Sequence, residues 1–412
     1  MKKLPDGWKE VKLSDILESI ENGNRPKGGI TDLKDGIPSI GGEHINSTGG
    51  FNLKNVRLIP EDFYNSMSRG KIQKEDVLVV KDGATTGKVS FVCSDFPYEA
   101  AAVNEHVFIL RGKKDLVFQK YLFYHLYSPI GQRQMDANFH GAAIGGINTQ
   151  FVKNYNLVLP PLPTQKKIAA VLEKAEKLRE WRKEADGLTD EFLKSTFLDL
   201  FGDPATNPKG WKVKKINDVV IEIEAGSCVI GEKRPRKENE FAVLMVSAVT
   251  KGIFLPDEYK VINSSQMLKK IVTPEKGDLL FSRANTYELV GATCLIGGDY
   301  PYLLLPDKLW KIKPDKSQLC SEYLKFVLSH AAIRNEISNN ASGTSGSMLN
   351  ISMSKLKSIN ITIPPIELQQ KFAHIVHQVE QIREHQTQSG QHIENFFNVL
   401  MQRAFRGELE AK

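Results

Sequence analysis

The chain has 412 residues, of which 41% are hydrophobic and 25% are charged, and its formal net charge is +6. This composition is typical of a globular chain and excludes a disordered or collagen-like one. Because 412 residues exceed what one hydrophobic core usually serves, we expect two domains. No apolar run approaches the roughly 20 residues of a membrane span, and Met1–Asp6 lacks the apolar segment of a signal peptide, so we expect a cytoplasmic protein.

The first half of the chain predicts a mixed α/β domain. Short apolar runs at Val77–Val80, Val89–Cys93 and Val103–Leu110 predict strands, and the loops between them are rich in Gly, Asn, Asp and Ser. A helix is predicted at Leu116–Tyr127. We therefore expect an α/β (α+β) fold with a strongly bent sheet.

A long helix is predicted over residues 164–201. Its apolar residues recur at two positions of a seven-residue frame, which is typical of a helix that packs along another helix. At a rise of about 1.5 Å per residue this helix is about 55 Å long. The predicted seam comprises Ile168, Val171, Ala175, Leu178, Ala185 and Phe192.

The second half of the chain repeats the first, about 204 positions later. Gly7-Trp8-Lys9 returns as Gly210-Trp211-Lys212, and Leu159–Leu162 returns as Ile363–Ile366. Several matches in the same order indicate an internal duplication, and therefore two similar domains in tandem. The predicted strands of the second half are Val243–Val246, Asp278–Phe281, Ala292–Ile296 and Leu309–Ile312, and its helix is Ser321–Ser338.

A second long helix, over residues 367–412, shares the register of the first. Its predicted seam comprises Phe372, Ile375, Val379, Ile382, Ile393 and Phe396. Both seams have polar centres, at Arg182 and Thr189 and at Gln386 and Ser389. We expect an antiparallel coiled coil in which this polar layer fixes the register. The alternative is that each helix packs onto its own domain.

The predicted organisation has five segments. Residues 1–163 form the first domain and 164–201 its helix, 202–210 form a linker, 211–366 form the second domain, and 367–412 form the second helix. Two unlike domains at the ends of helices of fixed length would suit two DNA segments at a fixed spacing, as in dimeric DNA readers.

The chain resembles the specificity subunit of type I restriction-modification systems over essentially its whole length. The resemblance rests on five segments in a fixed order, followed by the paired helices. These segments are Gly7-Trp8, Asp76-Val77-Leu78, Ala102–Val107, Gly145–Asn148 and Pro160–Gln165. In the second half Leu304–Lys308 and Ser347–Asn350 replace two of them, and only Asn148 and Asn350 match cleanly.

The resemblance implies a division of labour. Both domains would be target-recognition domains, each reading one part of a split, asymmetric DNA sequence, and the two helices would be conserved spacers. The subunit would have no catalysis and no cofactor of its own. Two modification subunits would carry the S-adenosylmethionine-dependent adenine methyltransferase, and two restriction subunits would supply the motor and nuclease that use ATP and magnesium.

Polar loops at matching places in the two halves are candidate DNA contacts. Arg25-Pro26-Lys27 is a basic loop stiffened by proline and has a counterpart at Arg234–Lys237, although a merely hydrated loop is the alternative. In each half a second loop follows a buried strand and carries hydrogen-bond donors and acceptors suited to base edges. The candidates are Arg25, Lys27, Lys81, Thr85, Thr86 and Lys88, and then Arg234, Arg236, Lys237, Ser282, Arg283, Asn285, Thr286 and Tyr287.

Other polar residues are weaker candidates for DNA contact. Polar residues beside glycine-rich turns often serve the turn, which applies to Asn104, His106, His140, Asn148 and Gln150. Gln165 and Gln369, where the long helices start, are expected to cap or position those helices.

The sequence does not match the motifs of an enzyme. Gly83–Val89 is one residue short of a P-loop and has Val89 where Ser or Thr must hold magnesium. No glycine-rich loop opens a βαβ unit as a nucleotide cofactor would require. The four cysteines lack metal-site spacing, and the histidines of the last helix are expected on a solvated face, so we expect no catalytic residue and no metal. The alternative function is a coiled-coil adaptor that joins two protein-binding domains without DNA.

Overall fold

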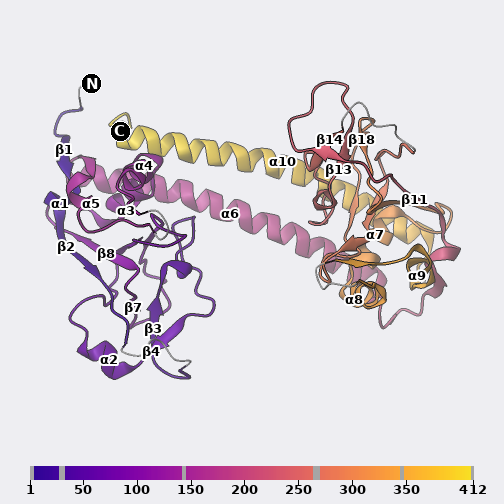
Figure 1. Ribbon diagram of the computed structural model, residues 1–412, viewed down its shortest axis with the longest axis horizontal. Coiled ribbons are helices and arrows are strands. Elements are labelled where there is room, and N and C mark those ends of the chain that lie inside the picture. The colour runs from indigo at the N-terminus through magenta and orange to yellow at the C-terminus, as the bar shows by residue number, and fades with distance from the viewer. Residues whose placement is uncertain (1–3, 27–32, 142–144, 263–269, 344–347, 410–412) are drawn as a thin grey trace. The chain divides into compact units, whose positions relative to one another are not determined.

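The computed structural model describes residues 4–26, 33–141, 145–262, 270–343 and 348–409. The chain divides into two compact units: unit 1 comprises Met1–Glu184 and Thr387–Lys412, and unit 2 comprises Ala185–Gln386. Two helices of 40 residues each, α6 (Leu162–Phe201) and α10 (Ile366–Phe405), contribute to both units (Figure 1). Each unit therefore contains one of the predicted repeats and a part of each long helix.

Unit 1 is built on a four-stranded antiparallel sheet in the order β2-β8-β5-β6. A three-stranded sheet, β4-β3-β7, and a two-stranded pair, β1-β9, complete the strands. The strands are β1 (Lys9–Lys12), β2 (Leu17–Asn22), β3 (Ile37–Ile40), β4 (Arg57–Ile59), β5 (Val77–Val80), β6 (Val89–Phe91), β7 (Ala102–Val103), β8 (Val107–Gly112) and β9 (Asn156–Leu159). The shorter helices are α1 (Leu13–Ile16), α2 (Glu61–Ser66), α3 (Gln119–Tyr127), α4 (Pro129–Ala137) and α5 (Phe151–Asn154).

Unit 2 repeats this plan. Its main antiparallel sheet has the order β11-β19-β15-β17, which matches that of unit 1 strand for strand, and β10-β21 matches β1-β9. The strands are β10 (Lys212–Lys215), β11 (Val220–Ala225), β12 (Gly231–Glu232), β13 (Ala242–Leu244), β14 (Tyr259–Ile262), β15 (Leu279–Ser282), β16 (Ala284–Asn285), β17 (Thr293–Leu295), β18 (Leu303–Leu304), β19 (Leu309–Pro314), β20 (Leu349–Asn350) and β21 (Asn360–Ile363). The shorter helices are α7 (Ser321–Ser329), α8 (Ala331–Asn340) and α9 (Met353–Ser358).

The predicted elements are largely confirmed, but two of them are divided in the structure, and the second long helix ends at Phe405 rather than at residue 412. The predicted strand Val103–Leu110 is two strands, β7 and β8, separated by the loop of residues 104–106. The predicted helix Ser321–Ser338 is two helices, because His330 between them has an extended backbone with ψ 137°. Apolar periodicity alone does not register a single extended residue.

The central strand of each main sheet is buried on both faces. Val77 and Val79 lie in the core that contains α3 and the long helices, whereas Leu78 and Val80 lie in a second core on the opposite face. In unit 2 Leu279 and Phe281 face one core and Leu280 faces the other. A continuous apolar run, rather than an alternating one, is what a strand covered on both faces requires.

A buried glutamine fixes each long helix to its domain. The Gln165 Oε1 atom accepts a hydrogen bond from the Phe118 N–H at 2.8 Å, and its Nε2 donates to the carbonyls of Leu116 and Pro160. Gln369 makes the same three contacts, with the Cys320 N–H and with the carbonyls of Gln318 and Pro364. The prediction that these glutamines position the helices is confirmed.

The two long helices pair antiparallel in the part that belongs to each unit. In unit 1 the Arg179 Nε atom lies 2.7 Å from Glu394 Oε2. In unit 2 Arg383 pairs with Asp190, and the Gln386 Nε2 atom donates to Thr189 Oγ1 at 3.2 Å. Contacts between rising numbers on α6 and falling numbers on α10 confirm the predicted antiparallel pair, and Thr189 and Gln386 belong to the predicted polar layer.

The predicted seam is half wrong. The first of the two seam positions, which starts at Ile168 and at Phe372, is also buried at Ala175 and Val379 and is half-buried at Ile393. At the second position only Ala185 and Ile375 among the apolar residues are half-buried. Its second position is exposed by 40–53% at Val171, Leu178, Phe192, Ile382 and Phe396. The buried residue is instead the next one along, at Leu172, Leu193, Val376 and Phe397.

The cause of this error is the width of the buried face. Leu172, Ala169 and Phe397 pack into the globular core of unit 1, and Leu193 and Val376 pack into that of unit 2. A helix that contacts both a helix and a domain core buries a wider stripe than a two-helix seam does. The alternative that the helices pack onto the domains is therefore also correct in part.

The core of unit 1 contains a histidine that unit 2 lacks. His125 on α3 is buried, and its Nδ1 atom lies 2.9 Å from the Tyr155 hydroxyl. Burial lowers the pKa of the His125 imidazole from 6.5 to about 3. The equivalent residues of unit 2 are Val327 on α7 and Ile359, whose carbonyl accepts from Ile216 as that of Tyr155 accepts from Leu13.

This difference predicts that unit 1 is acid-sensitive. The unfolded chain protonates His125 below about pH 6.5, whereas the folded chain keeps it neutral, so the free energy of unfolding falls by about 1.4 kcal/mol per pH unit below that point. The double substitution His125→Val and Tyr155→Ile copies unit 2 and should remove this slope. Urea unfolding at pH 7 and pH 5 measures it, and the exposed His140→Gln serves as the control that should retain it.

Candidate nucleic-acid interface

Three loops meet at the end of β5 in unit 1. The Lys81 N–H donates to the His106 carbonyl at 2.9 Å, and the Lys81 carbonyl accepts from the Ile147 N–H at 2.6 Å. Asp82 and His140 each form a bridge with Gly146. The loop after β5, the loop between β7 and β8, and the segment before α5 are thereby joined through their backbones.

Five charged or titratable side chains gather on these loops and on the segment after β2, and we call them the His106 cluster: Arg25, Lys81, Asp82, Glu105 and His106. The His106 Nδ1 atom lies 2.5 Å from Asp82 Oδ1, and Lys81 Nζ lies 3.6 Å from Asp82 Oδ2. Arg25 lies 2.7 Å from Glu105 Oε1. These side chains are 23–47% exposed, so they are accessible to a ligand.

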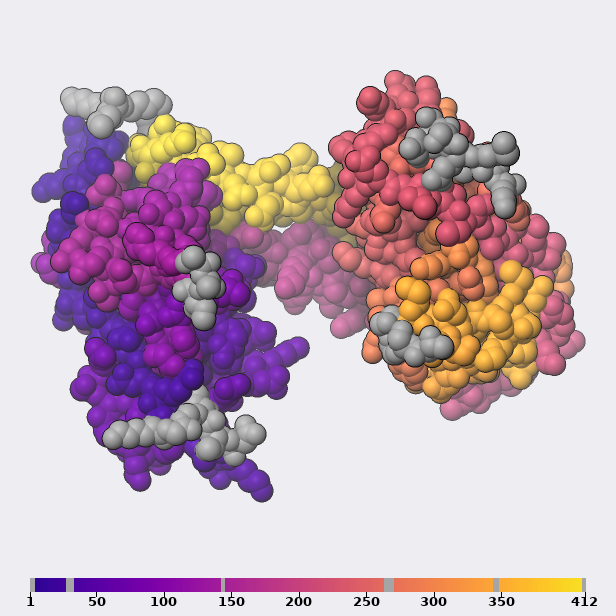
Figure 2. Space-filling view, in the orientation of Figure 1, coloured from indigo at the N-terminus to yellow at the C-terminus, as the bar shows by residue number. Residues whose placement is uncertain are grey.

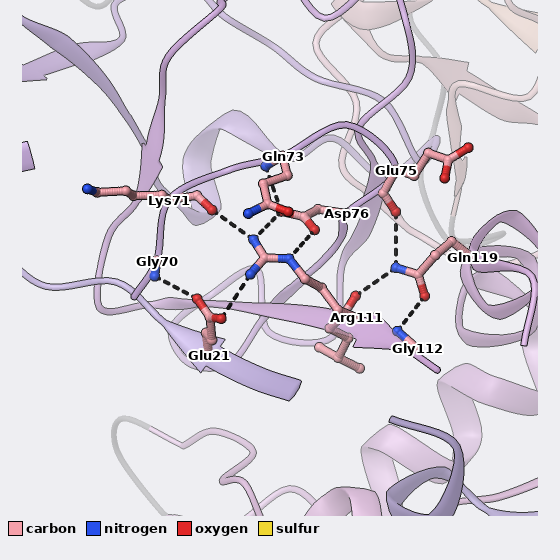
Figure 3. Close-up of polar contacts among 10 residues, drawn as sticks. Glu21, Gly70, Lys71, Gln73, Glu75, Asp76, Arg111, Gly112 and Gln119 are labelled. Atoms are coloured by element: carbon pink, nitrogen blue, oxygen red, sulfur yellow. Dashed lines mark hydrogen bonds and ion pairs between the residues drawn. The ribbon is translucent and has the colours of Figure 1, made fainter. Parts of the chain in front are cut away.

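The opposite end of β5 is held by a largely buried ion pair (Figure 3). Arg111 on β8 donates to both carboxylate oxygens of Asp76, at 2.7 and 2.8 Å, and also to Glu21 on β2 and to the Lys71 carbonyl. Burial raises the pKa of Asp76, and the hydrogen bond to Asp76 raises the pKa of Arg111. In unit 2 Asp278, the counterpart of Asp76, pairs at 2.7 Å with Lys311, which lies two residues before the position that Arg111 occupies in unit 1. Each strand that leads to a candidate loop is therefore fixed at its start.

Unit 2 joins the same three loops with different side chains. The Arg283 N–H donates to the Lys308 carbonyl, and the Arg283 carbonyl accepts from the Ile351 N–H, each at 3.0 Å. The Arg283 guanidinium contacts Asp307 and lies 5.9 Å from the centre of the Trp310 ring. By these contacts Arg283 is equivalent to Lys81, Asp307 to Glu105, and Lys308 to His106.

These equivalences correct one predicted match. Ser342 bridges to Asn350 as His140 bridges to Gly146, so the counterpart of Asn350 is Gly146 and not Asn148. The counterpart of Asn148 is Ser352, and both side chains accept from a backbone N–H two or three residues on. Two additional residues in the second loop shifted the sequence match.

The remaining candidates of the first half are less well placed. The Thr86 hydroxyl donates to the Gly83 carbonyl at 2.7 Å, and the Thr85 carbonyl accepts from Lys88, so both threonines serve the turn. Lys88 lines a hollow of about 260 Å³ together with Tyr127, Glu394 and Met401. Lys27 lies outside the described residues.

The basic loop of unit 2 is neutralised by its own glutamate. Arg234 makes a two-pronged contact with Glu240 at 2.8 and 3.0 Å, and Lys237 donates its N–H to the same carboxylate. The hydrogen bond from Arg234 lowers the pKa of Glu240 to about 2. The Arg236 guanidinium lies 5.6 Å from the centre of the Tyr302 ring.

The second loop of unit 2 contains one misassigned candidate. Ser282 is fully buried, so its side chain is not available to a surface ligand, and its assignment as a DNA contact was wrong. The sequence analysis placed Ser282 on the loop after the predicted strand Asp278–Phe281, whereas it is the last residue of β15. Asn285 accepts from the Thr286 N–H, and Tyr287 is 44% exposed with its hydroxyl 3.0 Å from Asn339.

The sequence analysis missed the acidic partners of the basic residues. Asp82, Glu105 and Asp307 were not candidates, because carboxylates repel DNA phosphates. Glu105 and Asp307 occupy the same position of the two repeats, and this match was the available signal. In the part of the chain that the structure describes, no three His, Cys, Asp or Glu residues are arranged to hold a metal.

Comparison with known proteins identifies the family. Residues 5–185 and 208–395 match the type I restriction modification DNA specificity domain. The chain belongs to this family. The specificity subunit of the type I restriction enzyme EcoKI of Escherichia coli (strain K12) is 26% identical over 435 residues, which cover 100% of this chain and 91% of that protein. The MjaVIII specificity subunit of Methanocaldococcus jannaschii is 21% identical over 100% of this chain and 95% of its own length.

Two solved structures share the fold. One comes from a study of complex assembly and conformational transition of the type I R-M system, with a TM-score of 0.60 and 20% identity over 99% of this chain and 100% of that one. The other is the type I restriction-modification system S subunit from M. genitalium, with a TM-score of 0.57 and 13% identity over 98% of this chain and 97% of that one. Among the described residues, no helix has the length and apolar character to cross a membrane.

Proposed function

We propose that this chain is the non-catalytic DNA sequence-specificity subunit of a type I restriction-modification complex. The carrying observation is that both repeats match the DNA specificity domain family and present the same three joined loops with different side chains. A shared frame with unlike polar loops suits two unlike half-sites of one split DNA target. The adaptor alternative gives no reason for basic side chains at equivalent places in both loops.

The chemistry of the complex would belong to partner subunits. We propose that modification subunits, two by the family's pattern, bring S-adenosylmethionine and methylate adenine. Restriction subunits, again two, would bring the ATP-driven motor and the magnesium-dependent nuclease. The five segments predicted from sequence would then be two target-recognition domains, a linker and two spacer helices, and the residue count of the helices would set the gap between the half-sites.

Methylation mapping tests this function. In the host genome, adenine methylation at one split, asymmetric sequence should be present with the gene and absent without it. The purified chain with its modification subunits should bind a duplex of that sequence with an affinity that falls steeply as salt rises. Absence of both effects would favour the adaptor.

Arg283 should contribute to one half-site only. Its guanidinium is 30% exposed at the end of β15, and the loops of unit 1 do not depend on it. We expect Arg283→Ala to weaken binding about tenfold and to relax sequence preference in one half of the mapped target. Methylation of a duplex library randomised in each half measures this. Equal weakening across both halves would contradict base reading by Arg283.

Exposed apolar residues on the long helices are the proposed docking surface for the modification subunits. In unit 1 these are Val171, Leu178 and Trp181 on α6 and Phe396 and Val399 on α10, each 40–56% exposed. In unit 2 they include Leu188, Phe192 and Ile382. A stretch of α10 is visible in yellow at the surface in Figure 2. Clustered apolar side chains of this kind mark a protein-binding surface.

Introduction of a charge into the apolar surface tests the docking proposal. Because Trp181 is 56% exposed, Trp181→Glu should leave the melting temperature within about 2 °C of the parent but should release the modification subunits during size-exclusion chromatography. Lys183→Glu, two residues along α6 and off the apolar stripe, is the matched control. Retention of the full complex by Trp181→Glu would show that the modification subunits dock elsewhere.

A further inference from the structure

His106 lies where one ring nitrogen meets both a donor and an acceptor. Its Nδ1 atom is engaged by Asp82 at 2.5 Å. Its Nε2 atom lies 3.4 Å from Arg25 NH2, which only donates, and 3.3 Å from Glu105 Oε1, which only accepts when ionised. One protonation state of the ring cannot satisfy both neighbours.

The two states therefore have different hydrogen bonds. In the neutral ring, with the proton on Nδ1 toward Asp82, Nε2 accepts from Arg25. In the charged ring, Nε2 carries a proton and donates to Glu105 or to another acceptor. Histidine is the side chain whose charge ordinarily changes between pH 5 and 8. The other ring nitrogen is held by Asp82 in both states, which fixes the direction of Nε2.

The electrostatic balance of the His106 cluster changes with that proton. The positive charges of Arg25 and Lys81 cancel the negative charges of Asp82 and Glu105, so protonation of His106 leaves one net positive charge. The segment before α5, which joins Asp82 at Gly146, contributes His140 as its titratable residue within the described part of the chain. His106 is 42% exposed, so a DNA base edge can reach it.

The described residues of unit 2 that correspond to Asp82, Glu105 and His106 include no histidine. Lys308 takes the place of His106, Asp307 that of Glu105 and Arg283 that of Lys81, as their backbone contacts establish. The residue of unit 2 that corresponds to Asp82 is Ala284, which has no carboxylate. The equivalent cluster of unit 2 therefore has a lysine in place of the histidine and no carboxylate in place of Asp82.

We infer that His106, oriented by Asp82, is a base-reading residue of unit 1, and that its protonated Nε2–H donates to an acceptor on a base edge, so that one half-site alone is read in a pH-dependent way. This inference rests on the proposed DNA-binding function. Purine N7, guanine O6 and thymine O4 are the acceptors that the major groove presents. One added charge-assisted hydrogen bond is expected to tighten binding about tenfold.

The test uses the full chain assembled with its modification subunits and duplexes of the methylation-mapped target. Binding is measured at pH 6.0 and pH 8.0 on the target and on duplexes altered in one half only. For the parent we expect about tenfold tighter binding at pH 6.0, and stronger discrimination at pH 6.0 in one half. That half should be the one that Arg283→Ala leaves unaffected.

Variants separate the ring's role from a structural one. His106→Gln should lose the pH dependence, and His106→Lys, which copies unit 2, should bind equally at both pH values. Asp82→Asn keeps an acceptor oxygen but not the charge, and should reduce discrimination in the same half. The exposed His374→Gln on α10 is the matched histidine control and should keep the parent's behaviour. Melting temperatures identify any variant that does not fold.

The outcomes are distinguishable. If the parent complex binds no mapped target, the proposed function fails. If it binds, but His106→Gln keeps the parent's pH dependence, the inference about His106 fails and the function stands. If His106→Gln weakens all duplexes equally, including those altered in either half, His106 contacts phosphate and the base-reading assignment is overturned.

Discussion

A single buried amide orients each long helix on its domain, and the rest of the architecture depends on it. Gln165 and Gln369 are both fully buried, and each satisfies an N–H and two carbonyls that lie outside any ladder. Loss of one partner would leave a buried polar group without a hydrogen bond, at a cost of about 1–3 kcal/mol. The direction of each helix is therefore specified by contacts with its own domain as well as by contacts with the other helix. Pairs such as Arg179 with Glu394 provide the contacts between the helices.

The two repeats share the framework that positions the loops and differ in the side chains on those loops. The strand order, the glutamine anchor and the ion pair at the start of the central strand recur in both units. The backbone bonds that join three loops recur as well, through Lys81 in one unit and Arg283 in the other. Side chains on those loops differ, and some core residues have diverged as well, as His125 and Val327 have. A fixed backbone with exchangeable polar groups gives each domain its own specificity at little cost in stability.

The sequence predicted the elements and the duplication, because both are recorded in local periodicity and in repeated motifs. It also predicted the role of Gln165 and Gln369 and the polar layer of Thr189 with Gln386. It mispredicted half of the helix seam, because burial there is set by the domain core and not by the partner helix alone. It placed Ser282 on the surface, although Ser282 is the buried last residue of a strand. It missed Asp82, Glu105 and Asp307, because ion pairs between residues distant in sequence leave no local pattern. The match of Asn148 with Asn350 failed for a related reason, since two additional residues alter the register without altering the fold.

The internal pairing of the basic residues bears on how DNA would be recognised. Arg25, Arg234 and Arg283 each contact a carboxylate of their own domain, so none of these guanidinium groups can contact a phosphate without competing with that carboxylate. A random duplex has to compete with these carboxylates, and non-specific affinity is therefore reduced. A duplex with the right base edges replaces the lost ion pair by bidentate hydrogen bonds of comparable strength. If these arginines read bases as proposed, discrimination would arise from exchange of partners, and the carboxylate beside each arginine would contribute to the specificity as the arginine does.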